Sequence, residues 1–215
     1  MESLEIPVIS VNPLLDEKDM EEIRRMVYRY ERMPEKHKEE DTFSLQLEKI
    51  NLVAAQINTV IKYMEFFKVD NRITFNELLI AIGEKFTPYS DRREMIREDI
   101  LRREKISSQI FAEFGFALLH TRTKGVTRPG FGVCMTKDLN PFEDPYFKGI
   151  TVVFIMLVPM DDNLQVNNDI LGYISSILIE KYEFMDVISK GEKEEIRDAL
   201  SGYLKKYFNK YLAKI

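Results

Sequence analysis

The order of hydrophobic and polar positions after residue 70 predicts helices that alternate with buried strands. Thr74-Phe-Asn-Glu77 has the pattern of a capping box and predicts a helix to about Phe86. Ser90 can cap a second helix, from Asp91 to about Lys105. The pattern then changes to short apolar runs, which predict strands at 116–119, 132–135 and 150–158, the last of them ended by Pro159. This alternation is typical of an α/β domain, a layered mixed sheet flanked by helices.

The C-terminal part of the chain is predominantly helical in pattern. Asp161 or Asp162 can cap a helix that continues to Lys181. The run 184–188 is short and ambiguous, and Gly191 precedes a last amphipathic helix at about 192–209. We expect the main domain to cover residues 68–211.

The N-terminal third reads as two smaller parts. Residues 6–11 predict a strand and residues 16–32 a helix, which together cannot enclose a core, so residues 1–33 read as the remnant of another domain. Residues 33–42 are polar, contain Pro34 and predict a linker. In the predicted helix 44–65, apolar residues recur at heptad spacing through Phe67, which fits either a helix lying on the next domain or the seam of a homodimer.

Composition removes several classes of function. The chain has 215 residues and a net charge of −5, which argues against a nucleic-acid footprint. Two histidines and one cysteine cannot assemble a zinc site, and no glycine-rich phosphate motif is present, so we expect no metal and no cofactor. No apolar run is long enough to span a membrane. The lone Cys134 and an N-terminus without a secretory pattern favour a cytoplasmic location.

His120 is the main candidate for chemistry. It directly follows the run 116–119, so we expect it at the C-terminal edge of a strand, where open α/β sheets bind ligands. His37, the other histidine, lies in the predicted linker. Glycines bracket the segment, and hydroxyl and basic residues follow His120: Thr121, Arg122, Thr123, Lys124 and Arg128.

A histidine without metal or acid partners suits phosphoryl transfer. Neutral imidazole is a good nucleophile near pH 7, and nearby cations stabilise the charge on a transferred phosphoryl group. Arg122 and Arg128 are available for that purpose. The same residues also fit an ordinary surface histidine.

Two motifs near His120 resemble those of a known protein family. Arg103-Glu104-Lys105 ends a predicted helix, a loop with Ser107 and Ser108 follows, and Gly115-Phe-Ala-Leu-Leu-His120 comes next. This arrangement resembles the enzyme IIA (EIIA) domain of the bacterial phosphotransferase system, mannitol/fructose type, in which "REK" precedes "G-x-A-x-P-H". The resemblance covers about residues 68–211 and implies the EIIA fold, with the histidine as phosphoacceptor.

A closer variant of the resemblance concerns regulatory proteins. The stretch from Phe116 to Pro129 is similar to the EIIA-like domain at the C-terminus of transcription regulators with phosphotransferase regulation domains, such as mannitol operon activators and BglG-type antiterminators. Residues 1–33 resemble the last strand and helix of the IIB-like domain that precedes it there. The resemblance implies control of a sugar operon.

The resemblance also implies roles for individual residues. His120 would be the phosphoacceptor, and Arg103 and Asn163 would stabilise the phosphate; Arg122, close to His120 in sequence, is expected to do the same. Asn163 stands where mannitol transport proteins carry a second histidine, and Leu119 replaces the usual proline. The loop before His120 is one residue longer than the family pattern, and its Phe111 and Phe114 are candidates for partner docking.

Three functions follow from these observations. The first is a regulatory domain phosphorylated by the phosphocarrier HPr and read by neighbouring domains, an acceptor of phosphate and not a turnover enzyme. The second is a sugar-specific transport EIIA that passes phosphate to a IIB. The third is an interaction module that is not phosphorylated.

Overall fold

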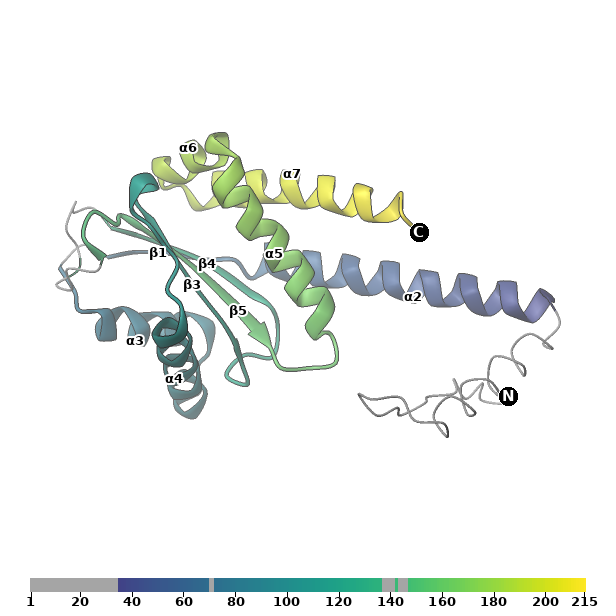
Figure 1. The fold of residues 1–215 in the computed structure, drawn as a ribbon, viewed down its shortest axis with the longest axis horizontal. Helices are drawn as coiled ribbons and strands as arrows, with labels where there is room; N and C mark the ends of the chain where they lie inside the picture. The colour runs from purple at the N-terminus through teal and green to yellow at the C-terminus, as the bar shows by residue number, and fades with distance from the viewer. Residues whose placement is uncertain (1–34, 70–71, 137–141, 143–146) are drawn as a thin grey trace. The chain divides into compact units, whose positions relative to one another are not determined.

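The computed structural model describes residues 35–69, 72–136, 142 and 147–215 (Figure 1). The chain divides into two compact units, residues 1–49 and 50–215. The predicted strand and helix before residue 34 lie outside the described residues. The second unit contains the sheet and the candidate site.

A mixed five-stranded sheet forms the centre of the second unit (Figure 1). Its strands, in spatial order, are β1 (Glu65–Val69), β4 (Gly130–Thr136), β5 (Val152–Pro159), β3 (Phe116–Thr123) and β2 (Ile110–Phe111). β3 and β5 are parallel, in a register that runs from Phe116 opposite Val152 to Thr123 opposite Pro159. β1 pairs parallel with β4, whereas the β4–β5 and β2–β3 pairs are antiparallel. The predicted α/β class with a mixed sheet is confirmed.

Helices cover both faces of the sheet (Figure 1). On one face lie α3 (Phe75–Phe86) and α4 (Ser90–Ile106); on the other lie α5 (Leu164–Glu180), α6 (Tyr182–Lys190), α7 (Lys193–Leu212) and the C-terminal part of α2 (Glu35–Lys62). A short 3₁₀ helix, η1 (Ala112–Phe114), precedes β3. The predicted helices 75–86, 91–105 and 192–209 are confirmed to within a few residues, and the ambiguous run 184–188 belongs to α6.

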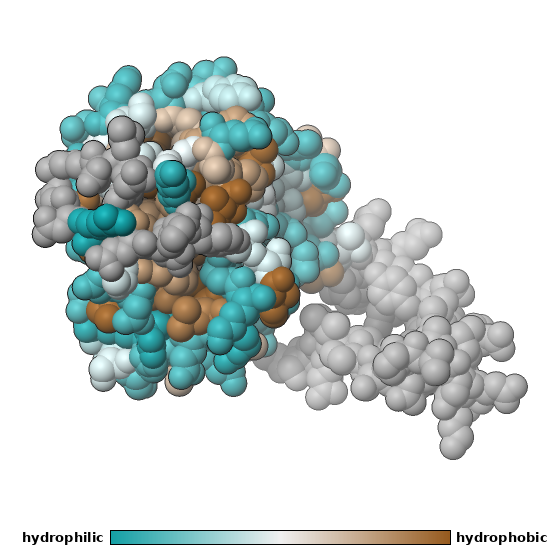
Figure 2. All heavy atoms as spheres, turned by 60° about the vertical axis from the view of Figure 1, so that its left-hand side comes forward, coloured by the Kyte–Doolittle hydropathy of each residue, from teal (hydrophilic) through white to brown (hydrophobic). Residues whose placement is uncertain are grey.

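Side chains of successive strand residues enter two separate cores. In β3, Phe116 and Leu118 join the core under α5, α6 and α7, whereas Ala117 and Leu119 join the core under α3 and α4. All eight residues of β5 are buried, as expected for a strand covered on both faces. Figure 2 shows hydrophobic residues at the surface between the two helical layers and hydrophilic residues over the helices.

The heptad residues of α2 pack within this chain's own core. Val53, Ile57 and Val60 are buried in the core under α5 to α7. This packing favours the interpretation of a helix that lies on the domain over that of a dimer seam. The helix is longer than predicted, because it begins at Glu35 inside the expected linker, and it ends at Lys62. Phe67 lies in β1, a strand that the heptad pattern concealed.

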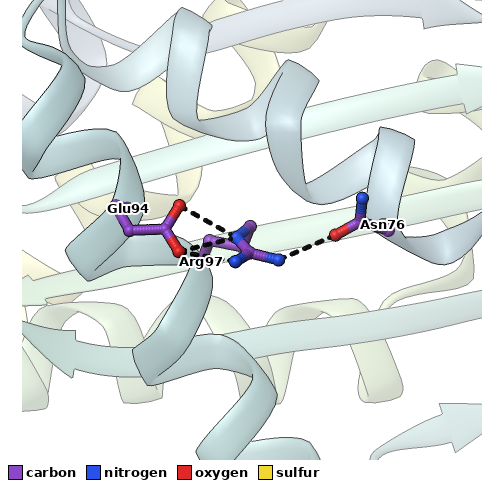
Figure 3. A network of polar contacts seen from close by, with 3 residues as sticks. All are labelled: Asn76, Glu94 and Arg97. Carbon is purple, nitrogen blue, oxygen red and sulfur yellow. Dashed lines mark hydrogen bonds and ion pairs between the residues drawn. The ribbon is translucent and has the colours of Figure 1, made fainter.

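Polar contacts hold the start of α3 and join it to α4. The Thr74 hydroxyl accepts a hydrogen bond from the Glu77 N–H, and the Glu77 carboxylate accepts one from the Thr74 N–H at 2.7 Å, so the predicted capping box is confirmed. Arg97 of α4 bonds both Glu94 and the side-chain oxygen of Asn76 in α3 (Figure 3). The expected cap by Ser90 is wrong: Ser90 is the first helical residue and Tyr89 precedes it without a side-chain cap.

The predicted strand 116–119 is four residues too short. Pairing with β5 continues to Thr123, so His120 lies within β3 and not at its end. The polar residues Thr121, Arg122 and Thr123 resemble a loop in sequence, yet the backbone ladder to β5 extends through them. The two-residue β2 was not predicted, because it is too short to show a period.

Among the described residues, no helix is both long enough and apolar enough to cross a membrane.

Replacing Phe154 with alanine should destabilise the fold by about 3–5 kcal/mol, the usual cost of emptying a buried aromatic site. Phe154 is fully buried, and its ring lies 5.3 Å from that of Phe116 and 6.3 Å from that of Phe131. Urea unfolding measures the loss. Ile179→Ala, at a side chain that is 43% exposed on α5, is the control and should change stability much less. A similar loss in both variants would contradict the position of the core.

Candidate functional site

The candidate site is a cleft at the open edge of the sheet beside β3. β2 pairs only with Phe116 and Ala117, so the rest of β3 has no neighbouring strand on that side within the described part of the chain. The Leu118 N–H points toward this edge, where it donates to the Gln109 carbonyl at 2.9 Å. Because direction alternates along a strand, the backbone groups of His120 and Arg122 point the same way. A cleft of about 600 Å³ opens there.

Two helices and two strands line the cleft. The C-terminal half of α4 supplies Asp99, Arg102, Arg103 and Ile106; β3 supplies Leu118, His120, Thr121 and Arg122; α5 supplies Asn168, Leu171, Gly172 and Ser175. Met156 and Val158 of β5 complete the wall, and Met156 lies directly opposite His120 in the strand register. The cleft therefore has an apolar interior and a cationic rim.

His120 is half-buried, with one ring nitrogen open to the cleft. Its Nδ1 is buried and has no hydrogen-bond partner. Nε2 has no hydrogen bond to another described residue, and it is not among the fully buried atoms. It is therefore the nitrogen that a ligand can reach. The ring is on the same side of β3 as Phe116 and Leu118, because side chains alternate along the strand.

Two effects favour the neutral form of this imidazole. Burial lowers the pKa of His120 below its ordinary value, and the positive charge of Arg103 lowers the pKa further. The Leu118 backbone acts in the opposite direction and is the smallest of the three causes. Both effects favour the unprotonated imidazole, which is the form that a nucleophile requires.

The predicted arginines, Arg103 and Arg122, both line the cleft. Arg103 is in the last turn of α4, where its Nη1 donates to the Ser107 carbonyl at 2.9 Å. Arg122 is exposed two residues after His120, hence on the same side of β3. Arg102, which the sequence reasoning missed, also lines the cleft and pairs with Asp99 at 3.0 Å. These arginines can hold an anion.

Three other residues near His120 in sequence make contacts outside the cleft, although Thr121 also lines it. The hydroxyl of Thr121 donates to the Asp99 carbonyl of α4 at 3.3 Å, and the buried hydroxyl of Thr123 accepts from the Gly125 N–H at 2.9 Å. Arg128 stacks over the ring of Tyr63 and lines a different pocket. Successive side chains of β3 point to opposite faces of the sheet, and the chain turns after Thr123, so these residues contact different parts of the domain.

Asn163 lies directly before α5, whereas Asn168 lies within it. Asn163 precedes the helix and its backbone N–H donates to the Asp161 carboxylate at 3.0 Å; it is not among the residues that line the cleft. Asn168, five residues later, lines the cleft. The sequence signal for it is the polar or small residue that recurs on one helix face at 168, 172 and 175.

The two predicted docking aromatics differ in exposure. Phe111 is half-buried, with its ring centroid 4.7 Å from that of Phe116. Phe114 is 42% exposed, and its ring lies 6.1 Å from that of Tyr182, which is 66% exposed. Both lie before the start of β3, and neither lines the cleft.

No group of three or more histidine, cysteine, aspartate or glutamate side chains in the described ranges is arranged to hold a metal ion. Cys134 is buried, which raises the pKa of its thiol to about 12 and leaves it unreactive.

The chain is similar in sequence and in fold to known proteins. A family model described as phosphoenolpyruvate-dependent sugar phosphotransferase system, EIIA 2, matches residues 54–203. The crystal structure of nitrogen regulatory protein IIA-Ntr from Neisseria meningitidis is similar, with a TM-score of 0.52 and 20% identity over 66% of this chain and 99% of that chain. At this identity the likeness shows the fold. None of the curated proteins compared with this chain matches it.

Replacing Arg103 with glutamine should raise the pKa of His120, because the guanidinium charge disfavours the imidazolium. The imidazole signals of the two histidines can be followed by NMR as the pH is varied, with His37→Gln used to assign them. In the parent chain the His120 midpoint should lie below that of an unperturbed histidine.

Arg102→Gln is the matched control, since this neighbour on α4 is already paired with Asp99. It should leave the His120 midpoint nearly unchanged. Equal midpoints in the parent and the Arg103 variant would contradict the electrostatic coupling.

Proposed function

This chain belongs to the EIIA 2 family of the phosphoenolpyruvate-dependent sugar phosphotransferase system, and from that membership we propose that His120 is the phosphoacceptor of a regulatory EIIA domain. The observation that carries the proposal is a half-buried imidazole, its pKa lowered by burial and by Arg103, in a cleft that is also lined by arginines. HPr, with its phosphohistidine, is the expected donor.

The step transfers a phosphoryl group between two imidazoles. The lone pair on His120 Nε2 forms a new N–P bond while the donor's N–P bond breaks, and that electron pair returns to the donor ring. The ring proton of His120 stays on Nδ1. Because Nδ1 faces the protein interior and Nε2 faces the cleft, only one nitrogen is positioned to react.

Arg103 and Arg122 stabilise the transferred group. The phosphoryl group spreads negative charge over three oxygens, and a guanidinium can bond two of them at once. The apolar wall made by Leu118, Met156, Val158 and Leu171 excludes water and strengthens these interactions. The same wall limits hydrolysis of the phosphohistidine.

The proposed regulatory role is supported by a position at which this chain differs from the transport proteins it resembles. By the family resemblance, Asn163 stands where mannitol transport proteins carry a second histidine. An amide cannot carry a proton onward, which suits a modification that is read as a signal. The added charge of about −1.5 to −2, a size taken from phosphorylated hydroxyls, would change how neighbouring domains of a sugar-operon regulator dock. A transport EIIA is the alternative, and rapid discharge of the phosphorylated chain to a cognate IIB distinguishes it.

Incubation of the full chain with phosphoenolpyruvate, enzyme I and HPr should place an acid-labile phosphate on His120. His120→Ala should abolish the label, whereas His37→Ala should keep it. Mass spectrometry under alkaline conditions locates the modified residue. A chain that stays unlabelled, or is labelled elsewhere, sinks the phosphoacceptor role and leaves the interaction module.

Substitutions of Asn163, which precedes α5, and of Asn168 within α5 test whether these side-chain amides contact the phosphate. Asn168 lines the cleft, so Asn168→Ala should slow phosphorylation about tenfold, the usual size of one lost hydrogen bond to a charged group. If Asn163 stabilises the phosphate as the family position implies, Asn163→Ala should slow it as much. Initial labelling rates at limiting HPr measure both. Parent-like rates in both variants would remove α5 amides from the site.

Phe114→Ser should slow labelling by raising the HPr concentration needed for half-maximal rate, because an exposed aromatic is typical of a docking surface. The maximal rate should change little, since Phe114 is outside the cleft. Ile80→Ser, at a side chain that is also exposed but lies on α3, serves as the control. An unchanged HPr dependence in the Phe114 variant would exclude this residue from docking.

A further inference from the structure

A second pocket, separate from the His120 cleft, gathers three cations. Its volume is about 150 Å³, and it shares no lining residue with the cleft. Four chain segments meet there: the end of α2 with the start of β1, the end of α3, the start of α4, and the turn between β3 and β4. Its polar and aromatic lining includes Lys85, Arg92, Arg128, Glu65, Tyr63 and Tyr89.

The ion pairs among the described residues do not include the cations of this pocket. Neither Lys85, Arg92 nor Arg128 forms an ion pair with any carboxylate of the described residues. With Glu65 as the only acid in the lining, the pocket has a formal charge of +2. The chain as a whole has a net charge of −5, so the positive charge is specific to this pocket. A pocket lined by positive charge attracts anions.

Aromatic rings hold both guanidinium groups in place. Arg128 lies over Tyr63 with 3.7 Å between the guanidinium carbon and the ring centroid, and Arg92 lies over Tyr89 at 5.0 Å. Stacking leaves the N–H edge of a guanidinium free, and that edge matches two oxygens of a phosphate. Less side-chain entropy is therefore lost when an anion binds.

The backbone that carries these side chains is closely packed. A Cβ at Gly125 would lie 2.6 Å from the Arg92 carbonyl oxygen, and one at Gly130 would lie 2.7 Å from the Phe86 ring. The β3–β4 turn is thus held against the start of α4 and the end of α3. Thr87 and Thr127 add hydroxyl groups to the lining.

We propose that this pocket, made by Lys85, Arg92 and Arg128, binds the phosphate group of a small phosphate monoester or inorganic phosphate. A volume of about 150 Å³ holds a phosphate and a few further heavy atoms, given that one water occupies about 30 Å³. Tyr63, Phe86 and Tyr89 can contact the organic part. The proposal is independent of phosphorylation at His120.

The test uses the full chain with His120→Gln, so that phosphate binding in the first cleft is weakened and a failed phosphoacceptor role cannot affect the result. Amide NMR signals are followed during titration with inorganic phosphate and, separately, with glycerol 1-phosphate, at constant ionic strength in chloride. Saturable shifts should concentrate at residues 85–92 and 125–130. The tighter of the two ligands identifies the source of the phosphate.

Substitutions decide whether the named cations carry the binding. Arg128→Gln and Arg92→Gln should each weaken the affinity about tenfold, as expected for a lost charge-assisted bond. Lys206→Gln, which removes an exposed lysine over Tyr203 on α7, should have no effect. Shifts confined to the His120 cleft, shifts that chloride reproduces, or parent-like affinity in the Arg128 variant would each overturn the proposal.

Discussion

The functional architecture of this chain depends on one constraint, the register between β3 and β5. This ladder runs over eight pairs, although only the first two residues of β3 also have β2 beside them. The buried β5 fixes β3 from one side and leaves the other side open. His120 therefore combines a rigid backbone with an accessible side chain, a combination that a loop residue would lack.

The ladder also explains how cations from different layers meet around the imidazole. Arg122 belongs to the same side of β3 as His120, whereas Arg103 reaches the cleft from α4, a helix of the opposite layer. This meeting is possible only where the sheet ends. At a central strand, the two layers would be separated by the next strand, and the burial that lowers the pKa of His120 would also prevent access.

Much of the fold was predictable because its signals are local. The capping box at Thr74, the uninterrupted apolar run of β5 and the turn residues around Gly191 each identify an element from a few neighbours. β1 was concealed because Met64 and Phe67 continue the spacing of the preceding helix, and β3 was shortened because its last residues are polar. Those assignments depend on pairing with distant strands, which no local pattern contains.

The candidate site was also predicted only in part from the sequence. His120, Arg103 and Arg122 were identified from motif and charge, and all three line one cleft. Arg102 and Asn168 were missed, and Arg128 proved to belong to a second pocket, because their positions follow from how α4, α5 and the β3–β4 turn pack. Residues that are adjacent in the sequence can line different pockets, because successive side chains of a strand point to opposite faces of the sheet.

The contact between Gly115 and Thr151 has a consequence for how this family can vary. The Thr151 N–H donates to the Gly115 carbonyl at 2.8 Å, so pairing with β5 is set directly before β3 begins, and Gly115 adopts a left-handed φ of 68° as the chain leaves η1. Residues gained or lost upstream would be accommodated in the turn and would leave His120 at its position in β3. One residue gained or lost between Gly115 and His120 would instead send the imidazole to the wrong layer. Indels should therefore be tolerated on one side of this glycine and forbidden on the other.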